Sequence, residues 1–124
     1  MACNTVVIVS NHAEMRVSLE ALVRGAGLEF ESANSLKLWL ESDAQPVPAC
    51  CVLLDVAEGD LVASDQIAMF AGVCSTHRVL VLVSSADVAT AVQAIRHGAA
   101  EVIQKPFEHC SILERIKQLV STTS

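Results

Sequence analysis

The chain has 124 residues, of which 52% are apolar and 18% charged, and it carries a net charge of −6. This length and composition suit one ordinary domain with its own apolar core, so we expect a single domain over residues 1–124. The acidic charge repels phosphate backbones, which argues against direct binding of nucleic acid.

The N-terminus lacks the charged segment and the following apolar stretch of a signal peptide, and no apolar run approaches the ~18 residues that span a bilayer. We therefore expect a soluble, cytoplasmic protein with no membrane partner. The chain has five cysteines, an odd number, and no C-x-x-C pair. This favours buried thiols over a zinc or redox site. The cysteines are Cys3, Cys50, Cys51, Cys74 and Cys110.

Strand and helix patterns alternate along the chain. Short apolar runs predict strands over 5–9, 28–32, 50–54, 79–83 and 100–104. Helical spacing of apolar residues predicts helices over 13–24, 36–41, 64–73, 87–97 and 108–120, the second capped by Asn34 or Ser35. Strict alternation predicts an α/β fold with helices on both faces of a parallel sheet, and the length fits the flavodoxin-like, doubly wound strand order 2-1-3-4-5.

Ligand sites in this architecture lie where the carboxyl ends of the first and third strands meet. Asp55 follows the third strand and Lys105 follows the fifth, so we expect these two charges to converge. They form either a structural ion pair or a nucleophilic carboxylate whose charge the lysine neutralises during phosphoryl transfer. His12 is expected near the same edge of the sheet. It is either a polar group that lines the ligand site or a solvated residue at the start of a helix.

Three segments carry a resemblance to a known family: VVIV at 6–9, LLDV at 53–56, and ADVATAVQAIRHGAAEVIQKPF at 86–107. With these segments the whole chain resembles the receiver domain of bacterial two-component response regulators, especially the FixJ type. The resemblance implies that Asp55 is the phosphoacceptor position, phosphorylated by a histidine kinase. It implies that Lys105 pairs with the phosphate and that the prolyl bond after Lys105 is cis.

The chain departs from this family at its acidic pair. Ser10 and Asn11 stand where the family has two acidic residues that bind Mg²⁺ with the phosphoacceptor. Because Mg²⁺ needs hard oxygen ligands, and usually one or two carboxylates, Asp55 with a hydroxyl and an amide makes a poor metal site. Asn11 has a second interpretation as the N-cap of the following helix, with Glu14 at the third helical position.

The chain also departs from the family at two switch positions, whose side chains move when a receiver is activated. Val83 falls at the family's switch hydroxyl, and Val102 falls at its aromatic switch position. Valine cannot donate a hydrogen bond, although both valines also suit a buried strand. Ser84 is adjacent to Val83, but successive strand residues point to opposite faces, so Ser84 substitutes only if the strand ends early or bulges.

These departures predict a degenerate receiver, or pseudo-receiver. It is a non-enzymatic signal-transduction module that acts through protein–protein contacts, with lost or impaired Mg²⁺-dependent aspartyl phosphorylation and no cofactor. The alternative is a receiver that accepts phosphate on Asp55. A nucleotide- or flavin-binding protein is disfavoured, because no glycine-rich phosphate loop follows the first strand.

The resemblance also implies the class of partner. A histidine kinase, an output domain or a transcription factor is expected. Homodimerisation through the face made by the fourth helix, the fifth strand and the fifth helix is a further possibility.

Overall fold

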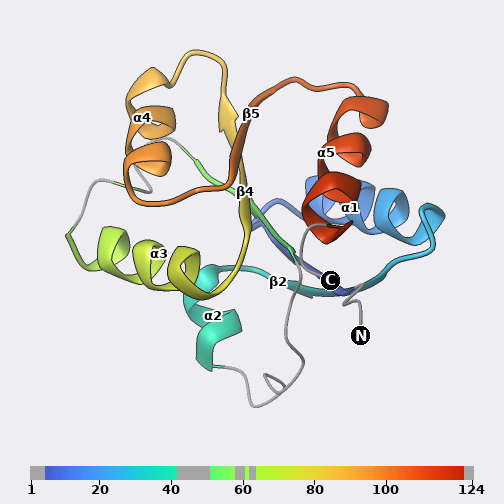
Figure 1. Ribbon diagram of the computed structural model, residues 1–124, viewed down its shortest axis with the longest axis horizontal. Coiled ribbons are helices and arrows are strands. Elements are labelled where there is room, and N and C mark those ends of the chain that lie inside the picture. Colours follow the sequence, from blue (N-terminus) through green and yellow to red (C-terminus); the bar gives the residue numbers. More distant parts are fainter. Residues whose placement is uncertain (1–4, 42–50, 58–60, 62–63, 122–124) are drawn as a thin grey trace.

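The computed structural model describes residues 5–41, 51–57, 61 and 64–121. Five strands form one parallel sheet in the order β2-β1-β3-β4-β5. The strands are β1 (Thr5–Val9), β2 (Glu29–Ala33), β3 (Cys51–Asp55), β4 (Val79–Ser84) and β5 (Glu101–Lys105). The predicted fold class and strand order are therefore confirmed, and the chain has the flavodoxin-like, doubly wound fold (Figure 1).

Five helices connect the strands. They are α1 (Ala13–Gly25), α2 (Leu36–Glu41), α3 (Ser64–Thr76), α4 (Val88–Arg96) and α5 (His109–Ser121). The α1 helix ends before Gly27, whose φ of 79° is a conformation that glycine adopts without steric cost. Ser35, rather than Asn34, caps α2, because its hydroxyl accepts a hydrogen bond from the amide of Leu38 at 3.1 Å.

Some predicted boundaries were wrong by a few residues. The second strand lies one residue later than predicted, because its register with β1 runs from Thr5 opposite Glu29 to Val9 opposite Ala33. The third helix continues past 73 to Thr76. The fourth strand extends to Ser84, and the fifth begins one residue later than predicted. Residue 50, the predicted start of the third strand, lies outside the described residues.

Side chains of the sheet alternate between two apolar clusters. On one face, Leu53, Leu80 and Leu82 pack against residues of α1 and α5. On the other face, Leu54, Val81 and Val83 pack against residues of α2, α3 and α4. Figure 1 shows α1 and α5 together on one side of the sheet and α2, α3 and α4 on the other. The central strands are covered on both faces, which explains their continuous apolar runs.

The described residues contain no helix that is both long enough and apolar enough to cross a membrane.

Candidate functional site

Asp55 is the last residue of β3 and follows four buried apolar residues. Its side chain is only 2% exposed, yet both carboxylate oxygens have donors. The Lys105 ammonium lies 2.5 Å from Oδ1, and the Ser10 hydroxyl donates to Oδ2 at 2.9 Å. A buried carboxylate needs such partners, because desolvation without them is costly.

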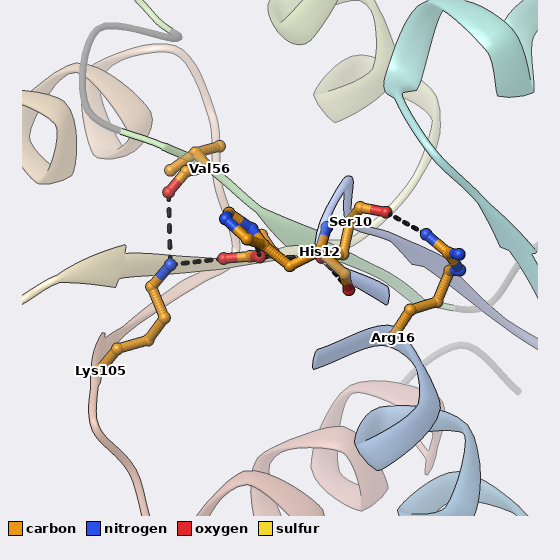
Figure 2. A network of polar contacts seen from close by, with 6 residues as sticks. Ser10, His12, Arg16, Val56 and Lys105 are labelled. Carbon is orange, nitrogen blue, oxygen red and sulfur yellow. Dashed lines mark hydrogen bonds and ion pairs between the residues drawn. The ribbon is translucent and has the colours of Figure 1, made fainter. Parts of the chain in front are cut away.

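Lys105 is the last residue of β5 and is followed by a cis peptide bond to Pro106, as the family resemblance implies. Its ammonium also lies 3.5 Å from the carbonyl oxygen of Val56 (Figure 2). The lysine side chain is 23% exposed, so the ion pair has one buried partner and one partly solvated partner. The expected convergence of Asp55 and Lys105 is present.

The loop from β1 to α1 supplies the remaining polar contacts of Asp55. His12 places Nδ1 at 3.5 Å from Oδ2, although its side chain is 65% exposed. Figure 2 shows this imidazole between Lys105 and Ser10. Both interpretations of His12 therefore hold in part, since the ring is solvated and also borders the carboxylate. Because a protonated imidazole is a cation, it would add to the positive charge around Asp55.

Ser10 fixes the shape of this loop. Its hydroxyl accepts a hydrogen bond from the amide of His12 at 3.1 Å, and its own amide donates to the carbonyl of Ala33 at 3.1 Å. Arg16 donates to the Ser10 carbonyl at 2.8 Å (Figure 2). Arg16 was not among the site residues predicted from the sequence. The available signal was its place in the first turn of α1, which begins beside the end of β1.

Asn11 is exposed and does not cap α1. The N-cap is His12, which makes no side-chain capping bond, so the prediction that Asn11 caps the helix was wrong. The reason is that α1 begins at Ala13, one residue too late for an N-cap at position 11. The side chain of Asn11 lines a hollow between β1, α2 and α3, whereas Ser10 points to Asp55.

The two expected switch positions lie in the apolar cluster that α2, α3 and α4 cover. Val83 is 1% exposed, and Val102 is partly buried against the same cluster. The structure brings neither valine into a polar contact with Asp55 or Lys105. Ser84 ends β4, where it pairs in register with Lys105. The strand neither stops early nor shifts its register before Ser84.

Two hollows meet at Asp55. One of about 490 Å³ lies between α1 and the start of α5 and is lined by His12, Lys105 and apolar residues that include Leu19 and Phe107. The other, of about 320 Å³, opens toward α2 and α3. Asp55 therefore lies near the surface on two sides, although its own carboxylate is covered by partners.

The residues at this edge do not fit a magnesium ion. Ser10, Asn11 and Asp55 occupy the three positions that the resemblance implies as metal ligands, and only Asp55 is a carboxylate. Lys105 and Ser10 already engage both of its oxygens. Asn11 lines the opposite hollow. Among the described residues, no group of three or more His, Cys, Asp or Glu side chains is placed to hold a metal ion. A carboxylate-poor donor set that already has a lysine partner is unsuited to Mg²⁺.

The described cysteines behave as apolar residues. Burial raises the pKa of the Cys51 thiol from 9.0 to about 12, and it raises that of Cys74 to about 11. These thiols stay protonated at neutral pH and are poor nucleophiles. Cys110 is exposed and free, and Cys3 and Cys50 lie outside the described residues.

Comparison with known sequences finds a nodulation protein and a transcriptional regulatory protein. The chain is 29% identical over 111 residues to nodulation protein W of Bradyrhizobium diazoefficiens, a match that covers 90% of this chain and 48% of that protein. It is 27% identical over 116 residues to the transcriptional regulatory protein FixJ of the same organism, covering 93% of this chain and 56% of FixJ. The chain thus spans about half the length of these relatives. No protein-family model matches it.

Solved structures agree on the fold. A response regulator receiver protein from Pseudoalteromonas atlantica superposes with a TM-score of 0.80 at 20% identity, covering 97% of this chain and 99% of that one. A putative response regulator from Chloroflexus aurantiacus gives a TM-score of 0.80 at 24% identity, covering 96% and 98%. At these identities the similarity establishes the architecture, and the chemistry of the site has to be argued from its own residues.

Proposed function

We propose that this chain, a response regulator receiver domain related to FixJ and nodulation protein W, is a signalling module that works without phosphorylation of Asp55. It would act by binding other proteins rather than by catalysing a reaction. The observation that carries this proposal is the closed shell of donors around Asp55, in which Lys105 engages one carboxylate oxygen and Ser10 the other.

Phosphoryl transfer to a carboxylate depends on neutralising charge on the transferring group. A bound metal ion contributes several kcal/mol of that stabilisation. Here Ser10 and Asn11 replace the two acidic residues that the family resemblance implies as metal ligands, and the remaining donor set does not suit Mg²⁺. Lys105 would have to leave Asp55 or share it before an oxygen could attack phosphorus.

The direct test uses the purified chain with phosphoramidate and Mg²⁺, followed by intact-mass measurement over time. We expect no gain, or only a slow, Mg²⁺-independent gain, of one phosphate. The control is Asp55→Ala in the same conditions. A rapid, Mg²⁺-dependent gain that disappears in Asp55→Ala would overturn the proposal and favour a receiver that cycles by phosphorylation.

The partners follow from the same proposal. Relatives that are about twice as long include a protein named a transcriptional regulatory protein, so a histidine kinase, an output domain or a transcription factor is the proposed partner class. Homodimerisation through α4, β5 and α5 belongs to the same proposal. Exposed apolar side chains on α4, Val88, Val92 and Ile95, support protein contact on that side.

A further inference from the structure

His12 combines an exposed imidazole with a buried carboxylate partner. Its side chain is 65% exposed, that of Asp55 is 2% exposed, and Nδ1 lies 3.5 Å from Oδ2 of Asp55 (Figure 2). The side chains of His77 and His97 are also described, and neither forms an ion pair with a carboxylate. His12 is therefore distinct among the histidines whose side chains the structure describes.

The carboxylate decides which nitrogen of the His12 ring is free. An ionised carboxylate only accepts hydrogen bonds, so the neutral ring is favoured with its proton on Nδ1, facing Asp55. Nε2 then keeps its lone pair, and within the described residues it has no hydrogen-bond partner. An imidazole held in this form by an adjacent carboxylate is an activated nucleophile.

The surroundings of His12 favour an anionic group as what this nucleophile takes. Lys105 lines the same hollow of about 490 Å³, and its side chain is partly exposed. His12 is also the N-cap of α1, whose first-turn amides have no partner within the helix. A cation and a helix start both favour negative charge. Glu14 lines the hollow as well and opposes it, which is consistent with a slow reaction rather than a fast one.

His12 needs no metal ion for such a reaction, in contrast to Asp55. An anionic carboxylate and an anionic phosphoryl donor repel each other, and a metal ion normally offsets that repulsion. The neutral imidazole meets no such repulsion. Positive charge develops on its ring as the new bond forms, and the Asp55 carboxylate at 3.5 Å stabilises that charge.

We propose that His12, and not Asp55, is the residue at this edge that accepts a phosphoryl group, from a donor with a P–N bond such as a phosphoramidate or a phosphohistidine. The Nε2 lone pair forms the bond to phosphorus. The donor's P–N bond breaks with its electron pair on the departing nitrogen, and the Nδ1 proton stays on the ring beside Asp55. This inference rests on the proposed function, because Asp55 supports the ring only while it is itself unphosphorylated.

The test uses phosphoramidate, whose ammonio group leaves as ammonia, with EDTA in place of Mg²⁺. Phosphate gain is followed by intact mass and located by peptide mapping in alkaline conditions, in which phosphohistidine is stable. The unmodified chain is compared folded and unfolded in urea. His12 is expected to react about tenfold faster in the folded chain, since positioned carboxylates contribute factors of this order or more. His97 is the matched control and is expected to react no faster when folded.

Two variants separate the role of the carboxylate from that of charge. Asp55→Asn keeps the shape of the side chain and is expected to slow phosphate gain at His12 about tenfold. If the carboxylate only repelled the anionic donor, the same variant would react faster. His12→Gln is expected to remove the gain at this edge, and His97→Gln to leave it unchanged. Thermal unfolding checks that each variant is folded.

Either of two results would overturn the inference. One is a rate at His12 that is no higher in the folded chain than in urea, a comparison that needs no variant. The other is a folded Asp55→Asn chain that gains phosphate at His12 as fast as the unmodified chain or faster. The proposed function fails on a different observation, namely rapid, Mg²⁺-dependent phosphate on Asp55. That product is an alkali-labile acyl phosphate, so the two failures are distinguishable.

Discussion

The interior of the sheet and its carboxyl edge are stabilised in different ways. In the interior, residues such as Leu53 and Leu82 are buried between the sheet and helices α1 and α5, and each loses contact with water without needing a specific partner. At the edge, Asp55 depends on Ser10 and Lys105, which come from segments 45 and 50 residues away. Apolar pattern alone can specify the interior, whereas the edge requires particular partners.

The largest loss of stability is expected from a substitution in the interior of the sheet. Leu53→Ala removes a fully buried side chain at the centre of the cluster between the sheet, α1 and α5. We expect the free energy of unfolding to fall by about 4 kcal/mol, through lost burial and an unfilled cavity. Urea unfolding monitored by circular dichroism measures this loss. A loss below 1 kcal/mol would mean that the interior is not close-packed at this position.

The next largest loss of stability is expected from a substitution at the carboxyl edge of the sheet. Lys105→Met leaves the Asp55 carboxylate buried without its cation, and we expect a loss of about 3 kcal/mol in the free energy of unfolding. This value is at the low end for broken buried pairs, because the ammonium is partly exposed.

A matched double variant separates charge from packing at this pair. Asp55→Leu/Lys105→Met is expected to recover most of the stability lost in Lys105→Met, since no unpaired charge remains. If the double variant is as unstable as Lys105→Met, the cost comes from packing of the lysine stem rather than from the buried carboxylate.

The sequence predicted the interior well and the edge only in part. Continuous apolar runs such as 79–83 determine which residues are buried, because burial depends on each residue's own apolarity. They therefore predicted the topology and the convergence of Asp55 with Lys105. Contacts between side chains at the carboxyl edge of the sheet depend on the geometry of the loops, which the spacing of apolar residues does not predict. For this reason Ser10 was considered for a metal and not as a donor to Asp55, and Arg16 was missed.

Alternation predicted correctly that Ser84 and Val83 lie on opposite faces of the sheet. Ser84 points away from the face of Val83, as strand geometry requires. The direction in which it points was not evident without the register, which places Lys105 beside Ser84 and Asp55 beside Leu82.

A smaller effect is expected at the loop before α1. Ser10→Ala removes the hydroxyl that donates to Asp55 and accepts from the amide of His12. Lys105 still neutralises the carboxylate, so we expect a loss of about 1–2 kcal/mol in the free energy of unfolding. Asn11→Ala is the matched control at an exposed neighbour and should cost less than 0.5 kcal/mol. Equal losses in the two variants would show that the Ser10 bond contributes little.

The smallest expected effect is a pH dependence of the free energy of unfolding that comes from a buried thiol. Burial raises the pKa of Cys51 to about 12 from 9.0, so above pH 9 the unfolded chain releases a proton that the folded chain keeps. The stability contributed by this thiol is complete below pH 9 and is lost as the pH rises toward 12. At pH 10 the loss is roughly 1 kcal/mol.

The measurement for Cys51 is the difference in unfolding free energy between pH 8 and pH 10, for the unmodified chain and for Cys51→Ala. We expect the unmodified chain to lose more stability over this interval. An equal loss in both chains would mean that Cys51 ionises as readily in the folded state as in the unfolded state.

The proposed function depends most on the hydrogen bonds that Lys105 and Ser10 make to Asp55. The most direct measurement is a crystal structure of the unmodified chain soaked in millimolar MnCl₂, with the metal located by its anomalous signal. We expect Lys105 on one oxygen of Asp55, Ser10 on the other, and no manganese peak at the carboxylate. A manganese ion bound to Asp55, with Lys105 displaced, would contradict the proposed function.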